Sequence, residues 1–355
     1  MAEKTTKKRS SKVRLSDVAA RAGVGPATVD RVLNERGNVS EEVSRRVLAA
    51  ARELGLRRIL PSTHHRILRV NVILARPERP LITRMGVEMR RLSQRLDNRI
   101  SIHRTMLKYE SPEAIAEAMA RPGFDAVIVD APDHPLIHAT IADLMAKGQP
   151  VVTLISDVPG SARLAYAGID HYKAGRSAGY FLGRMTPPTA TAGKVIILCH
   201  HIGFQAHAER IRGLTDQLRT EVPHLELAEI VRGGDDADIS EVKLKEAFRR
   251  HPETVGIYNA GAGNRGVVAA MKADILPRRP IFIGHEMTAF TYQSLREGTM
   301  TLTIDQSPEM QSQYAMEVLM NHFGFEGANH AVPPYASTVP FLLYGPQNLP
   351  DTPPS

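Results

Sequence analysis

VRLSDVAARAGVGPATVDRVLNERGNVSEEVSRRVLAAARELGL, which spans residues 13–56, decides the architecture of the N-terminal part of this chain. Apolar residues recur at helical spacing in three runs, which predicts three short helices separated by two breaks. The first helix is expected over residues 15–22 and ends at Gly23, because glycine enters the left-handed backbone region at little cost. Pro26 opens the second helix, since proline in the first turn forfeits no hydrogen bond. Ser40 is expected to cap the third helix.

Two helices joined by a turn that contains glycine, with a third helix behind them, are typical of a helix-turn-helix. The second helix would then enter the major groove of DNA with its first residues, Pro26 and Ala27, at base edges. Arg31, one turn on, can donate two hydrogen bonds to a guanine, and Ala27 offers a methyl contact to a thymine. Thr28 is placed to bond a phosphate. Periodicity alone leaves open an ordinary three-helix bundle with solvated arginines.

The residues themselves decide between these readings. LSDVAARAGVGPATVDRVLN (residues 15–34) resembles the DNA-binding headpiece of the LacI family of transcription regulators, whose usual form is close to L-x-D-V-A-x-x-A-G-V-S-x-x-T-V-S-R-V-L-N. Two positions depart from it: Gly25 replaces a capping serine, and Asp30 replaces the serine before the arginine. Asp30 adds a negative charge to the DNA-facing helix, which implies a different operator. The resemblance adds Asn34 to the expected DNA contacts.

The charge distribution agrees with phosphate binding. Residues 1–69 hold 16 Lys and Arg against 7 Asp and Glu, a net charge of +9. The rest of the chain holds the remaining 29 basic and 31 acidic residues, a net charge of −2, so the whole excess of +7 lies in the segment with the three helices. A solubilising charge would be spread evenly. We therefore expect double-stranded DNA as a partner and an affinity that falls with salt.

Composition places the chain among globular proteins of two or three domains. It has 355 residues, of which 43% are hydrophobic and 23% are charged. Cys199 is the single cysteine, so no disulfide can form within the chain, which fits a reducing compartment. The basic start MAEKTTKKRSSK is followed by no apolar stretch, and no run approaches the length of a membrane span. We expect a cytoplasmic protein that does not contact a membrane.

The first 69 residues divide into three parts by composition. Residues 1–12 are expected to be a disordered basic arm, 13–57 the DNA-binding domain and 58–69 a linker. In the LacI family this linker carries a hinge helix with an N-x-x-A-R-x-L pattern, which is not visible here. Ile59 and Leu60 are candidates either to wedge into the minor groove or to pack on the next domain.

From residue 70 onward, short β-branched runs alternate with helical patterns. A strand over residues 69–74 precedes a helix over residues 85–96, and this cycle repeats to a late strand over residues 336–345. Such alternation predicts βαβ units and parallel sheets. The two successive halves resemble the type I periplasmic-binding-protein domain of the LacI family. The expected fold class is therefore α/β, a helix-turn-helix domain followed by a two-lobed domain with parallel sheets.

That resemblance sets the remaining boundaries. The effector domain is expected over residues 70–345. Its N-terminal lobe takes residues 70–168 and 305–330, and its C-terminal lobe takes residues 169–304 and 331–345. Residues 346–355 are expected to form a disordered, proline-rich tail.

Polar residues just past strand ends are the candidates for an effector site, because ligands of such folds bind outside the carboxyl ends of the strands. We select Asp157, Asp170, Phe204, Arg210, Asn259, Asn264, Glu286 and Gln306. Their carboxylates, amides and guanidinium can bond the hydroxyls of a sugar or polyol, while Phe204 or Tyr258 can stack on its apolar face. By the resemblance, Arg210, Asn264, Glu286 and Gln306 fall at sugar-binding positions of the family, whereas Ile155 stands where relatives often place an aspartate. Each polar residue could instead cap a helix or line a loop, Asp170 above all.

The sequence thus predicts a DNA-binding transcription regulator, a repressor whose operator affinity is controlled by a small polar effector. We expect a homodimer, with a tetramer left open. An α/β enzyme is the alternative, but no nucleophile elbow or phosphate loop appears. GAGNRG (residues 261–266) lacks the spacing of a dinucleotide-binding loop, so we expect no cofactor. The acidic stretch 235–238 is more typical of a solvated turn than of a metal-binding loop, so we expect no metal.

Overall fold

The structure is a computed structural model that describes residues 13–34, 39–54, 56, 67–96, 100–188, 193–199, 205–234, 236–325 and 338–353. The expected basic arm 1–12, residues 58–66 of the expected linker (Ile59 and Leu60 among them) and Phe204 lie outside the described residues. The chain divides into a small unit, Met1–Ile67 with Asn321–Gly327, and a large unit, Leu68–Met320 with Ala328–Ser355. No helix in the described part of the chain is both long and apolar enough to cross a membrane.

The N-terminal unit contains the three expected helices, α1 (Leu15–Ala22), α2 (Pro26–Leu33) and α3 (Glu41–Glu53). Gly23 ends α1 in the left-handed region with a φ of 66°, and Gly25 precedes Pro26 at the start of α2. The Ser40 hydroxyl accepts a 3.4 Å hydrogen bond from the amide of Val43 at the start of α3. Ten buried apolar residues from all three helices form one core: Val18, Ala19, Ala22, Val29, Val32, Leu33, Val47, Leu48, Ala50 and Ala51.

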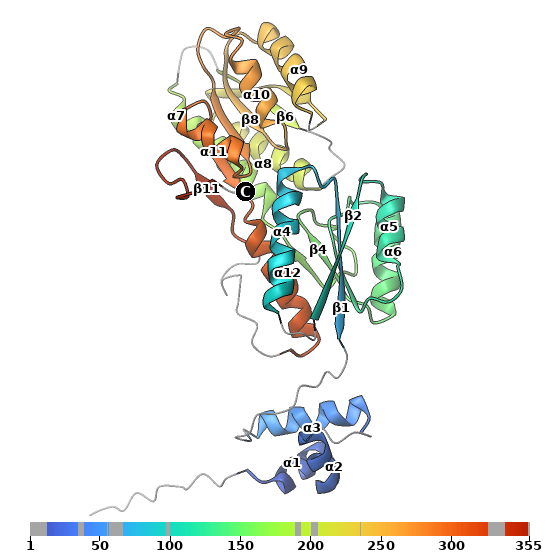
Figure 1. The fold of residues 1–355 in the computed structure, drawn as a ribbon. Coiled ribbons are helices and arrows are strands. Elements are labelled where there is room, and N and C mark those ends of the chain that lie inside the picture. The colour runs from blue at the N-terminus through green and yellow to red at the C-terminus, as the bar shows by residue number, and fades with distance from the viewer. Residues whose placement is uncertain are drawn as a thin grey trace, which may run out of the picture. The chain divides into compact units, whose positions relative to one another are not determined.

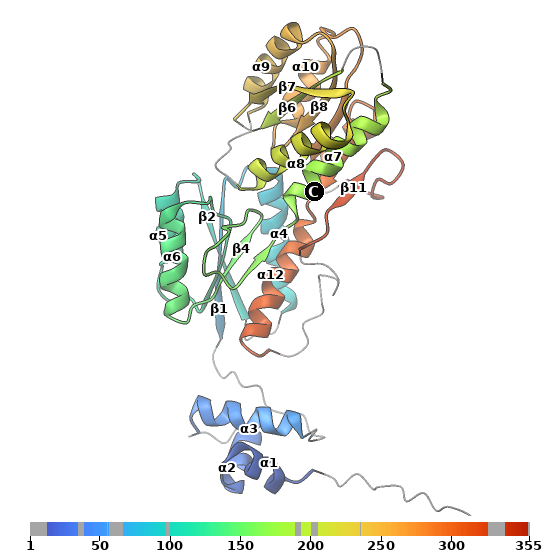
Figure 2. The ribbon, with the colours of Figure 1, turned by 180° about the vertical axis from the view of Figure 1, so that it is seen from behind.

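The N-terminal lobe of the large unit is built on a five-stranded parallel sheet of order β2-β1-β3-β4-β5. Its strands are β1 (Leu68–Ala75), β2 (Ile100–Leu107), β3 (Ala126–Val129), β4 (Val151–Leu154) and β5 (Ala165–Ala167). Its helices are α4 (Pro80–Arg95), α5 (Pro112–Met119), α6 (Pro135–Ala146) and α12 (Pro308–His322). Helices α5 and α6 cover one face of the sheet, and α4 and α12 cover the other (Figures 1 and 2).

The C-terminal lobe contains a six-stranded sheet of order β11-β10-β9-β8-β6-β7, parallel except for the antiparallel edge strand β11. Its strands are β6 (Gly193–Cys199), β7 (Leu225–Arg232), β8 (Thr254–Asn259), β9 (Ile281–His285), β10 (Leu302–Asp305) and β11 (Leu342–Tyr344). Its helices are α7 (His171–Met185), α8 (Gln205–Glu221), α9 (Ala237–Arg250), α10 (Asn264–Met271) and α11 (Ala289–Arg296). One core lies between the sheet and α7 and α8, and a second lies between the sheet and α9, α10 and α11.

The route of the chain makes both lobes discontinuous. It leaves the first sheet after β5, builds most of the second sheet and returns to the first lobe after β10 as α12. Residues 342–344 then pair with β10. On α12 the Ser312 hydroxyl donates to the Met85 sulfur of α4 at 2.7 Å, which joins these two helices although they are far apart in sequence.

Three elements differ from the sequence expectation. Helix α4 begins at Pro80 instead of residue 85, because Pro80 supplies a first helical turn. Helix α9 begins at Ala237, inside the acidic stretch 235–238 that was expected to be a solvated turn, and the Asp236 carboxylate caps it by accepting a 2.9 Å bond from the Ile239 amide. The late strand is only three residues long. The structure describes the proline-rich tail through residue 353, and the Asn348 side chain accepts a bond from the Gly345 amide and donates to the Leu343 carbonyl.

Candidate effector site and DNA-reading helix

Helix α2 is held in place by one apolar face. Val29, Val32 and Leu33 are buried, with exposed fractions of 0%, 7% and 3%. Burying an aliphatic side chain of this size contributes about 1.5–3 kcal/mol. The stripe therefore fixes which side of α2 faces away from the helix bundle.

The expected DNA contacts lie on the other side of α2. Pro26, Ala27 and Arg31 are exposed, and Thr28 is half-buried. Asn34 follows the last turn, where its amide donates to the carbonyl oxygen of Asp30 at 2.9 Å and to the Asp30 carboxylate at 2.7 Å. The Asp30 carboxylate, which departs from the family pattern, is thus bound by the residue that caps the end of the same helix.

A cavity of about 440 Å³ lies in the large unit and is lined by both lobes. The residues that reach it follow the carboxyl ends of strands from both sheets, among them Arg76 after β1, Asp130 after β3, Ile155 after β4, Gly261 after β8, Glu286 after β9 and Gln306 after β10. Ligands of α/β folds bind in this kind of crevice. The cavity is therefore the candidate effector site.

Arg210 projects into this cavity from α8 and is only 3% exposed. Its Nε donates to His171 Nδ1 at 3.1 Å, and its Nη1 donates to the Ala260 carbonyl at 2.8 Å. His171 Nε2 lies 2.8 Å from the Ile155 carbonyl oxygen, to which it donates. Burial, and then the Arg210 charge, hold the pKa of His171 well below its usual range. His171 is therefore a neutral acceptor that orients Arg210.

Two glycines bring the backbones of α7 and α8 together and so set the position of Arg210. A Cβ on Gly175 of α7 would lie 2.0 Å from the Arg210 carbonyl oxygen. A Cβ on Gly213 of α8 would lie 2.1 Å from the Tyr172 carbonyl oxygen. Neither site can hold a side chain unless the two helices move apart.

Glu286 and Gln306 form a second pair at the cavity, from the loops after β9 and β10. The Gln306 amide donates to Glu286 Oε1, and the side chain of Glu286 is 13% exposed. Burial first, and the neighbouring Asp305 charge second, raise the pKa of Glu286 to about 7. Glu286 Oε2 has no hydrogen-bond partner among the described residues.

Asp130 contributes a carboxyl group from the opposite lobe. It is 8% exposed, and its Oδ1 has no hydrogen-bond partner within the described part of the chain. Burial and the Glu110 charge raise its pKa to about 7, against the opposing effect of the Ser156 backbone amide. A buried acceptor without a partner costs free energy, which a ligand hydroxyl would recover.

Asn264 lies at the cavity and is oriented by its neighbours. Its amide nitrogen donates to the His285 carbonyl oxygen at 2.9 Å, and its oxygen accepts a 2.6 Å bond from Asn259. Asn259 is fully buried and does not line the cavity. Tyr258 is also buried, with its hydroxyl 2.8 Å from His285 Nε2, so it offers no ring face to the cavity.

Of the selected residues, the structure brings Arg210, Asn264, Glu286 and Gln306 together around the cavity. Asp157 does not line it, because its carboxylate is bound by the Arg163 guanidinium at 2.5 Å and by the Thr153 hydroxyl at 2.9 Å. Asp170 does not line it either, and caps α7 through a 2.9 Å bond from the Lys173 amide.

Sequence reasoning missed several cavity residues. Asp130 directly follows the apolar run AVIV, a signal of the same kind as those used for the selected residues. Arg265 and Phe290 stack at the rim, with the guanidinium carbon 4.5 Å from the ring centroid. No sequence pattern indicates that pair.

The backbone is strained at three non-glycine residues that line the cavity. Arg76, Ile155 and Glu286 have φ values of 59°, 63° and 72°. Each follows the end of a strand. Such conformations are uncommon for residues with a Cβ, and they cluster at functional sites. This strain is a second, independent indication that the cavity binds a ligand.

The cavity lining holds as many carboxyl groups as arginines. Arg76 is paired with Glu78, and Arg79 with Glu110. The remaining arginines, Arg210 and Arg265, are matched in number by the carboxyl groups of Asp130 and Glu286. The described residues contain no group of three or more His, Cys, Asp or Glu residues that could hold a metal ion. The arrangement suits an uncharged ligand with several hydroxyl groups.

Comparison with known families agrees with this division of the chain. The model of bacterial regulatory proteins of the lacI family matches residues 14–58. The model of the periplasmic binding protein domain matches residues 108–327, more than half of the chain. No match was found among curated proteins.

Solved structures resemble the large unit in fold. GanP, a glucose-galactose binding protein from Geobacillus stearothermophilus, has a TM-score of 0.69 and 19% identity, covering 80% of this chain and 99% of GanP. A solute binding protein from Burkholderia graminis, solved with D-arabinose, has a TM-score of 0.67 and 17% identity, covering 82% and 99%. A periplasmic solute binding protein from Actinobacillus succinogenes with bound D-allose has a TM-score of 0.66 and 16% identity, covering 79% and 98%. These identities support a shared fold.

Proposed function

This chain belongs to the lacI family of bacterial regulatory proteins and carries a periplasmic binding protein domain, and from this premise we propose that it is a repressor whose operator affinity is controlled by an uncharged sugar or polyol. The observation that carries the proposal is the cavity between the lobes, with Arg210, Glu286 and Gln306 around it. Membership of the family supports the DNA-binding part of this proposal, and the cavity supports the effector-binding part.

Helix α2 is proposed to read the operator in the major groove. Arg31 is exposed on α2 and can donate two hydrogen bonds to a guanine. Ala27 and Pro26, exposed in the first turn, would approach base edges, while Thr28 bonds a phosphate. Asn34 is proposed to hold Asp30 away from the phosphates, through their 2.7 Å hydrogen bond.

Two features support an uncharged effector with several hydroxyls. Asp130 and Glu286 each leave one buried carboxyl oxygen without a hydrogen-bond partner within the described residues, and hydroxyl donors would satisfy both. The cavity lining holds as many carboxyl groups as arginines, which disfavours a phosphorylated ligand. The solved proteins of similar fold named above bind sugars.

Control of DNA binding is proposed to pass through the angle between the lobes. A homodimer places two headpieces on two half-sites, which requires a fixed separation. An effector that binds residues of both lobes stabilises one lobe angle over others and so changes this separation.

Operator binding is tested first. Random duplexes are selected on the full-length protein, and the affinity for the selected sequence is compared with that for competitor DNA. Arg31→Ala should weaken specific binding by about 5- to 150-fold, equivalent to about 1–3 kcal/mol, and relax selectivity at one base position. Arg46→Ala, an exposed arginine on α3, serves as a charge-matched control and should reduce binding to all sequences equally. Unchanged selectivity in Arg31→Ala would contradict the assignment of α2.

Effector binding is tested by thermal unfolding with D-glucose, D-galactose, D-arabinose and D-allose. A ligand that binds only the folded state raises the melting temperature. D-Glucose 6-phosphate and D-galacturonate serve as anionic comparisons and should give no shift. Arg210→Met should abolish the shift, whereas Arg212→Met, on the same helix but 61% exposed, should retain it. Stabilisation by the anionic sugars alone would overturn the proposed effector class.

A further inference from the structure

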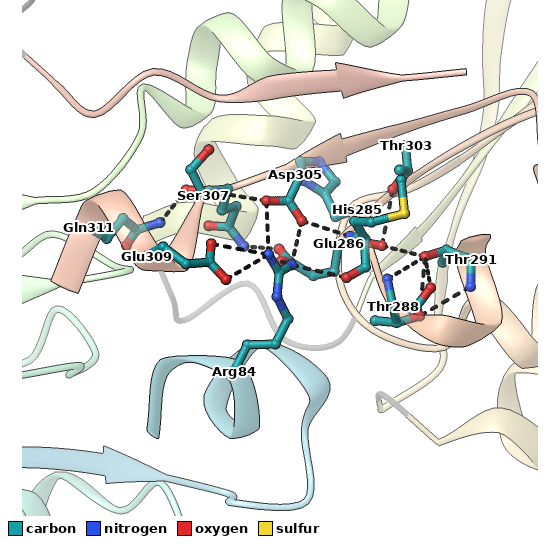
Figure 3. A network of polar contacts seen from close by, with 12 residues as sticks. Arg84, His285, Glu286, Thr288, Thr291, Thr303, Asp305, Ser307, Glu309 and Gln311 are labelled. Atoms are coloured by element: carbon teal, nitrogen blue, oxygen red, sulfur yellow. Dashed lines mark hydrogen bonds and ion pairs between the residues drawn. The ribbon is translucent and has the colours of Figure 1, made fainter. Parts of the chain in front are cut away.

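Arg84 is a buried arginine that crosses from one lobe to the other. It extends from α4 in the N-terminal lobe, and its side chain is only 11% exposed. Its Nη1 donates to Asp305 Oδ2 at 2.5 Å and to the Met287 carbonyl at 3.0 Å. Its Nη2 lies 3.2 Å from both carboxylate oxygens of Glu309, at the start of α12 (Figure 3).

The Asp305 carboxylate that binds this guanidinium is buried and held in place by backbone amides. Its side chain is 3% exposed and accepts two backbone hydrogen bonds, from Met287 and from Ser307, both at 2.8 Å. These bonds fix the carboxylate at the end of β10, where the chain passes back into the N-terminal lobe. Arg84 therefore holds α4 against a rigid point of the C-terminal lobe.

The same guanidinium lies close to the cavity. Glu286 Oε2 is 3.7 Å from Arg84 Nη1 (Figure 3). Glu286 Oε1 accepts a hydrogen bond from the side-chain amide of Gln306. Glu286 and Gln306 line the cavity, whereas Arg84 does not. Three carboxyl groups thus share one arginine. Burial lowers the pKa of Arg84, but the charges of Asp305, Glu286 and Glu309 outweigh burial and raise it, so Arg84 stays charged.

We propose that Arg84 is the positioning residue that links occupancy of the cavity to the arrangement of the lobes. A ligand hydroxyl that donates to Glu286 stabilises the carboxylate form of Glu286. The charge then attracts the Arg84 guanidinium across the 3.7 Å gap and draws α4 toward the loop after β9. The direction of this coupling rests on the proposed function, whereas the contact between the lobes does not.

The first test measures the distance between the lobes without any ligand. Spin labels are placed at Glu117→Cys on α5 and Glu246→Cys on α9, both exposed positions, in a full-length Cys199→Ala background. Arg84→Met should shift or broaden the distribution of distances between the labels. Arg91→Met, an arginine on the same helix that is 58% exposed, should leave the distribution unchanged. Arg84→Lys, which keeps the charge, should restore part of the parent distribution.

An Arg84→Met distribution identical to that of the parent would overturn the proposal. Circular dichroism establishes whether each variant folds. If Arg84→Met does not fold, Asp305→Asn replaces it, because it removes the carboxylate that Arg84 binds in the other lobe with nearly no change of shape. A smaller shift in the same direction is then expected, and no shift would overturn the proposal.

The second test measures coupling, with D-arabinose or whichever of the four sugars binds. Coupling is the factor by which saturating sugar changes the operator affinity, and typical allosteric couplings amount to about 5- to 150-fold. In Arg84→Met this factor should shrink by about 5-fold or more and approach one. Sugar affinity should also fall, because coupling is reciprocal and the sugar loses the Arg84 charge that supports the Glu286 carboxylate, so the operator affinities of parent and variant are both measured at saturating sugar. An unchanged factor would refute the coupling role. If none of the four sugars binds, the proposed effector fails, and the distance measurement still decides the role of Arg84.

Discussion

Asp130→Asn should make the protein more stable at neutral and higher pH, and this gain should disappear in acid. Asp130 is only 8% exposed, and one of its carboxyl oxygens has no hydrogen-bond partner among the described residues. Asparagine has nearly the same shape and can keep its oxygen on the Ser156 amide. The substitution therefore removes the cost of burying a charge and leaves the packing unchanged.

The size of the effect follows from the pKa of Asp130. Burial raises this pKa from 3.8 to about 7. A pKa difference of about 3, at about 1.4 kcal/mol for each pKa unit, corresponds to about 4 kcal/mol. The folded protein holds the proton more tightly than the unfolded chain, so the free energy of unfolding of the parent falls as pH rises from about 4 to about 7. The Asn variant lacks this loss, and its advantage grows over the same range.

Urea unfolding followed by circular dichroism, from about pH 5 to about pH 8, measures this advantage. Asp143→Asn is the matched control, because Asp143 is 59% exposed on α6 of the same lobe and should change stability by less than about 0.5 kcal/mol. Sugar binding should weaken in Asp130→Asn, since a carboxylate acceptor is lost. An equal dependence on pH in the parent and the Asn variant would refute the reasoning.

Two further predictions concern the residues that position Arg210. Gly175→Ala should destabilise the protein by about 1–3 kcal/mol and weaken sugar binding, because the new Cβ would meet the Arg210 carbonyl. Gly86→Ala is the helical control, with nothing within 4 Å of the new Cβ, and should stabilise the protein by about 0.5–1 kcal/mol. Denaturation that ranks these two variants in the opposite order would contradict the packing of α7 on α8. His171→Phe removes the acceptor of Arg210 Nε at a cost of about 1–3 kcal/mol, and calorimetry should show sugar affinity reduced by about 10-fold or more. Undiminished sugar affinity in a folded His171→Phe protein would show that His171 does not orient Arg210.

Local signals predicted the headpiece well. Gly23 ends α1 and Pro26 begins α2, because each has a backbone preference that needs no distant partner. The alternation of strands and helices likewise predicted both parallel sheets. The start of α4 was missed although local signals mark it, because Pro80 is typical of a first helical turn and Ile82 continues the buried face of Met85 and Met89.

The candidate site was predicted in part. Position after a strand end brings a residue near the crevice but does not say which way its side chain points. Asp157 satisfies that rule, yet Arg163, six residues later, binds its carboxylate. The positive φ of Ile155, which helps set the course of this loop, is not encoded in any local pattern. The ion pair between Arg84 and Asp305 joins residues 221 positions apart, so only the folded chain reveals it.

The order in which the chain passes through the two lobes bears on its synthesis. During translation β1 to β5 are synthesised long before α12, which must cover one face of their sheet. The second sheet is complete only when residues 342–344 have been synthesised and can pair with β10. The core of the headpiece, in contrast, is complete once α3 has emerged. A nascent polypeptide therefore completes the headpiece well before the domain that holds the proposed effector site.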